Sequence, residues 1–219
     1  MDHDALCEAT HTATEATWEK VGAVDPMLMV PAINPMFLGA PPWPNTRQSY
    51  RRIVCDRGVL RASDGLADPF DPENWEGAPA INGFELEVYA IGPDEDWVLE
   101  MVQQLAMQVA HAMSIADHVK EHGVFSMELW DVNLPEEHAA RFVNDEGRVG
   151  VLVGLQDEAV VPTFVDGPLS RIRLLNAKLL TLEELALVLE RGAEGRTELV
   201  GKLGGRDLLV SSLERASVV

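Results

Sequence analysis

The clearest periodic pattern lies at residues 84–91, where aromatic and aliphatic side chains alternate with Glu85 and Glu87. An alternation of period two is typical of a strand with one face in the core and the other in water. We therefore expect both glutamates on the wet face. If a helix covers that face instead, Glu85 becomes a buried carboxylate that needs a partner such as Arg61 or Arg173.

Two further strands are predicted upstream, at 48–55 and 59–64, with a tight turn at 56–58 in which Gly58 can adopt a positive φ. Residues 65–82 follow as a loop rich in proline, glycine and acidic side chains. Later apolar runs predict strands at 124–130, 148–155, 171–180 and 207–212.

Helical spacing is clearest at 94–116, which opens with three acidic residues suited to the positive end of a helix dipole. Another helix is predicted at 4–22. Thr181 and Glu184 have the spacing of a capping box, which opens a further helix, with a shorter one near 194–203. The apolar side chains that this capped helix is expected to bury are Leu182, Leu185, Val188 and Leu189.

Six prolines interrupt residues 25–44 and forbid a regular helix there. The segment is too apolar for a free linker, so we expect it to pack on the domain. The apolar side chains concerned are Met27, Leu28, Met29, Val30, Ile33, Met36, Phe37 and Trp43.

Strands and helices alternate without a repeat, which predicts a single compact α+β domain with a mixed, largely antiparallel β-sheet flanked by helices. Residues 1–46 are expected to form an N-terminal helix and an extended segment packed on a domain at 47–219.

Charge narrows the classes of partner. The chain has 36 acidic and 17 basic residues, and its formal charge of −19 repels nucleic acid and anionic membranes and attracts a basic protein. Cys7 and Cys55 give neither a disulfide framework nor metal spacing, and free thiols suit a reducing compartment. The N-terminus shows no secretion signal and no apolar run is long enough to span a membrane, so the cytoplasm is the expected location.

Several segments resemble the suppressor-of-fused family. Residues 63–70, Ser-Asp-Gly-Leu-Ala-Asp-Pro-Phe, look like the family's Gly-Leu-Ser-Asp turn, and residues 82–86, Asn-Gly-Phe-Glu-Leu, look like its Gly-Phe-Glu-Leu strand. Trp97 opens a segment similar to its tryptophan-led helix, and 175–203 resembles its late strand and helix. The likeness covers residues 47–203.

The resemblance implies a mixed sheet flanked by helices and a protein-binding role. Animal members bind a zinc-finger transcription factor of Hedgehog signalling with the help of a second domain, whereas bacterial members are thought to include immunity proteins that neutralise toxins. This chain resembles the N-terminal domain alone. We therefore interpret it as a prokaryotic, single-domain member.

The predicted docking surface surrounds the family-like turn. Phe70 would supply an apolar anchor, and Asp68 a charge-assisted hydrogen bond to a basic partner. In the competing interpretation, Phe70 fills the core and Asp68 caps the turn, so that both serve the fold alone. The residues proposed for partner binding are Asp64, Leu66, Asp68, Phe70 and Glu85.

An enzymatic alternative uses His111, His118 and His122, which share a face if the helix is unbroken and can then hold zinc. Together with Asp117 or Glu128 they would form a small metal-dependent hydrolase. A break near residue 114 would separate them.

Calcium is a further possibility for the acidic loop, although the loop lacks the EF-hand spacing. The carboxylates concerned are Asp64, Asp68, Asp71, Glu73 and Glu76. Because no nucleophile motif or P-loop is present either, we predict a protein without catalytic residues, cofactor or metal.

Overall fold

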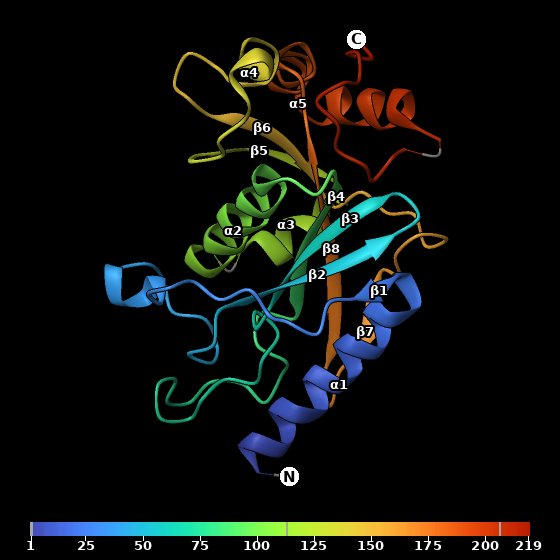
Figure 1. The fold of residues 1–219 in the computed structure, drawn as a ribbon. Helices are drawn as coiled ribbons and strands as arrows, with labels where there is room; N and C mark the ends of the chain where they lie inside the picture. The colour runs from blue at the N-terminus through green and yellow to red at the C-terminus, as the bar shows by residue number, and fades with distance from the viewer. Residues whose placement is uncertain (1, 113, 206) are drawn as a thin grey trace.

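The computed structural model describes residues 2–112, 114–205 and 207–219 (Figure 1). The helices are α1 (His3–Val21), the 3-10 helix η1 (Pro35–Leu38), α2 (Asp96–His111), α3 (Ser114–His122), α4 (Glu136–Phe142) and α5 (Leu182–Leu203). The strands are β1 (Ala23–Val24), β2 (Ser49–Cys55), β3 (Gly58–Asp64), β4 (Leu86–Gly92), β5 (Phe125–Leu129), β6 (Val149–Val153), β7 (Phe164–Asp166) and β8 (Arg171–Leu179).

Within the described residues, one mixed sheet organises the molecule. Its strand order is β1-β2-β3-β4-β8-β6-β5, and β7 pairs with the first residues of β8. The β4–β8 pair is parallel and the other paired strands are antiparallel. The predicted fold class, a single compact α+β domain with a mostly antiparallel sheet flanked by helices, is therefore confirmed.

Hydrophobic side chains cover both faces of the sheet. On β4, Val88 and Ala90 belong to the core beneath α2, whereas Tyr89 and Ile91 belong to a second core on the opposite face. Trp18 of α1 packs edge-on against Tyr89, with ring centroids 6.0 Å apart. Figure 1 shows α2 and α3 on one side of the sheet and α1 running along its other end.

This double coverage overturns the expectation of a wet face on the third predicted strand. Every residue of β4 is buried, including Glu87, which is only 3% exposed. Glu85 lies before the strand, in a left-handed conformation with φ of +56°. The buried carboxylate on this segment is thus Glu87, not Glu85.

The helices follow their predicted positions with several differences. The long helix expected at 94–116 ends at His111, and α3 begins at Ser114; residue 113 lies outside the described residues. Thr181 and Glu184 form the predicted capping box. The helix that they open buries Leu185 and Val188 but leaves Leu189 64% exposed, so that part of the prediction was wrong.

The end of the chain is less regular than predicted. Residues 207–212 form a single bridge, between Ile91 and Val210, in place of a strand. Within the same residues, Ser211 is buried, and its Oγ accepts a hydrogen bond from the backbone N–H of Leu179 in β8 at 2.9 Å. Sequence patterns also did not predict β1, η1, α4 or β7.

The proline-rich segment is held at its ends while much of it faces solvent. Met29 pairs with Tyr50 through an isolated bridge, and Trp43 is 1% exposed. Six apolar side chains of the segment are exposed: Met27, Leu28, Val30, Ile33, Phe37 and Leu38. All of these except Leu38 were expected to pack on the domain.

Candidate functional site

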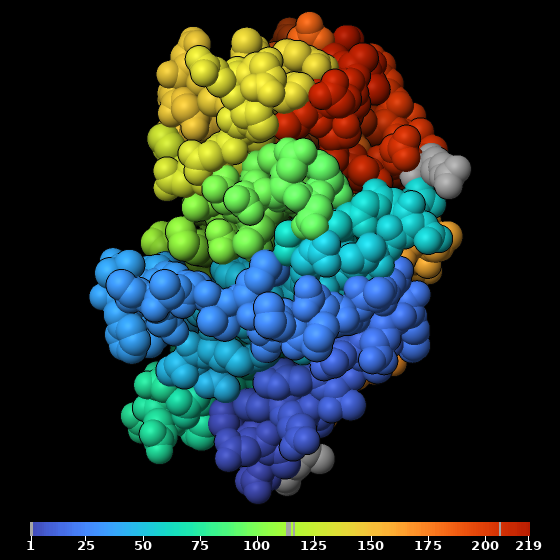
Figure 2. Space-filling model, viewed as in Figure 1, coloured from blue at the N-terminus to red at the C-terminus, as the bar shows by residue number. Residues whose placement is uncertain are grey.

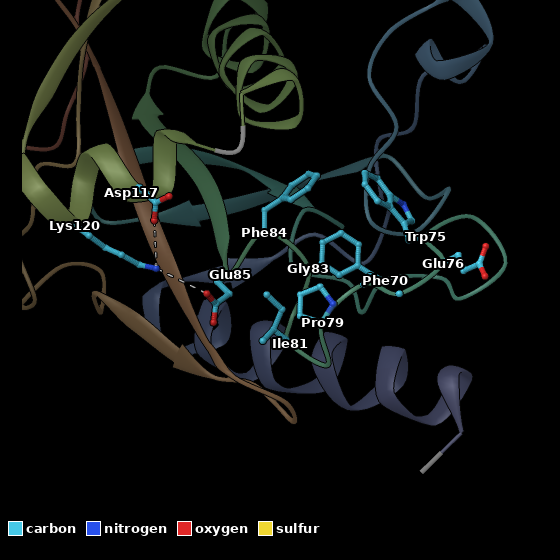
Figure 3. A pocket seen from close by; sticks show the side chains of 12 residues that line it. Phe70, Trp75, Glu76, Pro79, Ile81, Gly83, Phe84, Glu85, Asp117 and Lys120 are labelled. Carbon is cyan, nitrogen blue, oxygen red and sulfur yellow. Dashed lines mark ion pairs between the residues drawn. The ribbon is translucent and has the colours of Figure 1, made fainter.

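An apolar cavity of about 370 Å³ opens between the loop that precedes β4 and the helix α3 (Figure 3). We call it the Phe70 pocket. Its walls are mostly aromatic and aliphatic, and its rim is charged. The lining residues whose side chains shape it are Phe70, Trp75, Glu76, Pro79, Ile81, Phe84, Glu85, Asp117 and Lys120.

Three aromatic rings form the back of this pocket. The ring centroid of Phe70 lies 5.1 Å from that of Trp75 and 5.9 Å from that of Phe84. Trp75 is held from the other side, where its indole N–H donates to the backbone oxygen of Trp43 at 3.4 Å. Tilted and edge-on packing of this kind makes a preformed apolar wall.

A buried asparagine fixes the loop beneath the pocket. Asn82 is fully buried, and its Nδ2 donates to Thr10 Oγ1 at 2.8 Å and to the backbone oxygen of Ala67 at 3.2 Å. Its Oδ1 accepts from the backbone N–H groups of Leu169 and Ser170, each at 2.9 Å. One side chain therefore joins α1, the family-like turn and the β7–β8 connection.

The residue after this asparagine must be glycine. Gly83 has φ of +44°, and a Cβ there would lie 2.4 Å from the backbone oxygen of Leu66 and 2.6 Å from that of Asp68. This close approach of two backbone segments sets the position of Phe84, whose N–H donates to Leu66 at 2.9 Å.

The rim carries three carboxylates and one ammonium group. Lys120 Nζ lies 3.8 Å from Glu85 Oε2 and 3.9 Å from Asp117 Oδ1, as the dashed lines of Figure 3 show. Glu76 lines the opposite edge. All of these groups are partly or fully exposed, so the rim offers a net negative charge to an approaching partner.

A buried ionic cluster lies under the family-like turn. Arg47 donates to both oxygens of Asp64, at 3.0 and 3.1 Å, and to both oxygens of Asp68, at 3.2 Å each. Arg51 donates to Asp64 at 2.9 Å. His11 Nε2 of α1 lies 2.8 Å from Asp68 Oδ1. Although burial raises the pKa of Asp64, the two guanidinium groups hold it below its usual value.

Glu87 lies next to this cluster and, among the described residues, has no basic partner. Its Oε1 accepts from the backbone N–H groups of Gly65 and Ala67, at 3.1 and 2.9 Å, and its Oε2 accepts from the hydroxyl of Ser63. Burial raises the pKa of Glu87 to about 7, the carboxylate of Asp64 adds to the rise, and the three hydrogen bonds oppose it.

The structure separates the five predicted docking residues into two groups. Asp64, Leu66 and Asp68 are at most 3% exposed, and both carboxylates are bonded to Arg47, so these residues support the turn from inside. Phe70 and Glu85 line the pocket and are accessible there. For Asp68, the geometry corresponds to the structural interpretation considered above.

Sequence reasoning missed most of the pocket wall. Trp75 and Ile81 lie in a loop without periodicity, and the alternation at 84–91 marked Phe84 only as the start of a strand, so no pattern assigned the three residues to one site. Arg47 was also missed, because its partners are 17 and 21 residues away in the sequence. The signal available in the sequence was the occurrence of three aromatic residues within 70–84.

The candidate metal ligands do not meet in one place. His111 ends α2, whereas His118 and His122 lie on α3 with their rings stacked at 6.0 Å. Over the described residues, no group of three or more histidine, cysteine, aspartate or glutamate side chains has a metal-binding arrangement.

The acids considered for calcium are likewise divided. Asp64 and Asp68 face arginine, and Asp71 accepts from the backbone N–H of Glu73 at 2.9 Å and from Asn74.

Among the described helices, none combines the length and the apolar character that a bilayer crossing requires.

Comparisons with known proteins identify the fold. No family model matches the chain, and no curated protein matches it. A chain of a solved structure described as the Sufu-Fu complex crystal structure superposes with a TM-score of 0.52 at 17% identity, over 97% of this chain and 91% of that chain. This match confirms the suppressor-of-fused-like fold that the sequence resemblance implied.

A second solved structure, described as the crystal structure of Drosophila Suppressor of Fused, matches with a TM-score of 0.42 at 14% identity. The matched region covers 78% of this chain and 39% of the Drosophila chain.

Proposed function

We propose that this chain is a non-catalytic protein-binding domain, and that a basic partner inserts an apolar side chain into the Phe70 pocket. The observation that carries the proposal is an aromatic cavity with an acidic rim, next to a loop that the buried Asn82 bonds to α1 and to the β7–β8 connection. Interfaces concentrate binding energy where an anchor side chain fills such a pocket and polar groups surround it.

The chemistry of the pocket favours binding over catalysis. Among the described residues that line it, there is no serine, cysteine or histidine to act as a nucleophile or a proton shuttle. Its charged groups, Glu85 and Asp117, share the ammonium group of Lys120 at the rim. A cationic side chain of a partner can take the place of that ammonium group.

The fold supports the same class of function. The similar chain of the Sufu-Fu complex comes from a protein complex, and the likeness extends over nearly the whole of this chain. Because a shared fold does not carry a shared partner, the partner is defined here by its chemistry: a basic segment with an exposed apolar side chain.

A synthetic amphipathic peptide of leucine and lysine serves as the probe. We expect the purified chain to bind this peptide in fluorescence anisotropy, and Ile81→Ser to weaken binding about tenfold by removing part of the apolar wall. Leu189→Ser is the matched control, because it replaces an exposed aliphatic residue on α5, far from the pocket lining. Equal losses in both variants, or none in either, would exclude the pocket as the docking site.

The charge requirement is tested separately. Glu85→Asn keeps a residue type that tolerates positive φ, and with Asp117→Asn it removes two rim carboxylates. We expect the double variant to bind the leucine-lysine peptide more weakly. A leucine-glutamate peptide should bind neither protein.

Toxin neutralisation, which the family resemblance implies for bacterial members, is a narrower form of this proposal. Its test is growth rescue: the chain, co-expressed with the product of a neighbouring toxin gene, should restore growth, and Ile81→Ser should restore less. Binding without rescue would leave the docking function standing and remove the immunity role.

A further inference from the structure

The proline-rich segment, residues 26–46, contains no charged side chain, although 24% of the chain is charged. We call this segment the arm. Six of the ten large apolar side chains that are exposed in the described residues belong to it. Phe37 is 78% exposed, and Met27 and Leu38 are each 74% exposed. A concentration of apolar surface on a strongly acidic protein indicates a binding surface.

Hydrogen bonds anchor the arm at several points along its length. Met29 and Tyr50 exchange two backbone hydrogen bonds, at 2.8 and 3.0 Å. Asn34 accepts from the N–H of Met36 at 3.0 Å and donates to the backbone oxygen of Thr46 at 2.6 Å, which ties the two limbs of the arm together. A surface fixed in this way loses little conformational entropy when a partner binds.

The arm is continuous with the Phe70 pocket. A second cavity, of about 240 Å³, lies between the arm and the loop at 71–81. Trp75 lines both this cavity and the Phe70 pocket. Its indole N–H donates to the backbone oxygen of Trp43 in the arm. Figure 2 shows the arm in light blue next to the teal surface of the loop, along one edge of the molecule.

The loop at 71–81 along this edge carries acidic charges alone. The loop between the two cavities carries Asp71, Glu73 and Glu76, and the sequence contains no lysine or arginine between Arg61 and Lys120. Glu73 and Glu76 are exposed. A partner that covers the apolar surface must therefore place its own cations over these carboxylates.

We infer that the arm and the Phe70 pocket form a single interface, and that its occupant is a basic, amphipathic segment of another protein. The apolar face of that segment covers Phe37 and Leu38 and fills the cavities on both sides of Trp75, while its basic side chains meet the loop carboxylates. The inference rests on the proposed function and extends its footprint from one pocket to the whole edge of the molecule.

Other occupants are opposed by charge. A second copy of the chain would bring together two molecules of charge −19, and an anionic membrane would meet the same acidic edge. Both are tested directly. Sedimentation across a wide concentration range should give a monomer, and vesicles of phosphatidylcholine and phosphatidylserine should not retain the chain.

The footprint is tested with the leucine-lysine peptide. In hydrogen exchange, we expect binding to protect residues 27–38 and 70–84 together. Phe37→Ser and Leu38→Ser should together weaken binding about tenfold, as expected for losing anchor side chains. Both side chains are exposed, so the double variant should remain folded, and Leu189→Ser again serves as the control.

Each outcome decides between the two proposals. Protection of 70–84 alone, with full affinity of the Phe37→Ser and Leu38→Ser variant, would overturn the extended interface and leave the pocket proposal intact. Absence of binding to the wild-type chain would overturn both. If the arm variant and Ile81→Ser both bind the peptide more weakly, while Leu189→Ser binds it with unchanged affinity, the single interface is supported. If the wild-type chain forms a dimer that the arm variant does not form, the occupant of the arm is a second copy of the chain. If vesicles retain the chain, the occupant is a membrane.

Discussion

Arg47 and Asp64 form a two-point ion pair, with Nη1 to Oδ2 at 3.1 Å and Nη2 to Oδ1 at 3.0 Å. Arg47 immediately follows the arm, and Asp64 ends β3, so the pair joins the arm to the sheet. The same guanidinium also holds Asp68 in the turn below the Phe70 pocket. The position of the candidate interface thus depends on a largely buried cluster of charges beneath it.

The first prediction concerns Asp68. Asp68→Ala removes a carboxylate that is 1% exposed and leaves Arg47 with fewer partners. Because breaking a buried ion pair leaves an uncompensated charge, we expect a loss of about 3 kcal/mol in the free energy of unfolding. Urea denaturation measures it, with the exposed Glu73→Ala as the control. An Asp68→Ala protein of unchanged stability and weakened peptide binding would restore Asp68 as a docking residue.

The second prediction uses a pair of glycines. Gly83→Ala would place a Cβ 2.4 Å from a backbone oxygen at φ of +44°, and we expect it to destabilise the fold by about 2 kcal/mol or more. Gly201 lies in α5 with nothing within 4 Å of an added Cβ. Gly201→Ala should therefore stabilise the protein by up to about 1 kcal/mol. Thermal unfolding should therefore give a lower melting temperature for Gly83→Ala and a higher one for Gly201→Ala than for the wild type. Two shifts in the same direction would contradict this prediction.

The fold was largely predictable because most elements carry their own local signals. The tight turn before Gly58 and the capping box of Thr181 and Glu184 depend on residues close in the sequence. The prediction that Glu87 faces water was wrong because its surroundings are set by residues far away in the sequence. Whether it meets water depends on α1, some 70 residues upstream, covering the second face of β4.

The candidate site was only partly predictable for the same reason. Phe70 and Glu85 were selected from a local resemblance, and they do line the pocket. Asp64 and Asp68 stand in the same local sequence, yet Arg47 binds them from a segment with no pattern that links it to the turn. Local sequence identified the neighbourhood, and tertiary contacts decided which of its residues face outward.

The third prediction concerns the rate of association. The charge of −19 and the acidic rim should steer a basic probe, so the association rate of the leucine-lysine peptide should fall as ionic strength rises. The dissociation rate should change much less, because apolar contacts in the pocket are not screened by salt. Stopped-flow fluorescence at low and moderate salt measures both rates. An association rate that does not change with salt would remove electrostatic steering and leave the pocket contacts untouched.

The last prediction follows from Glu87, whose pKa is raised from 4.5 to about 7 chiefly by burial. Between these values the folded chain holds a proton that the unfolded chain has released, so the contribution of Glu87 to stability is complete below pH 4.5 and is lost as pH rises through about 7. The shift corresponds to roughly 3 kcal/mol. Glu87→Gln keeps an oxygen to accept the N–H groups of Gly65 and Ala67 but cannot titrate. We therefore expect the difference in unfolding free energy between wild type and Glu87→Gln, measured in urea from pH 4.5 to 8, to shift against the wild type by that amount. Titrating groups that do not interact with Glu87 cancel in this difference, and Asp64, which does interact with it, has a pKa held below its usual value, under the range of the measurement. A constant difference across the range would mean that Glu87 is already ionised at pH 4.5, held by its three hydrogen bonds.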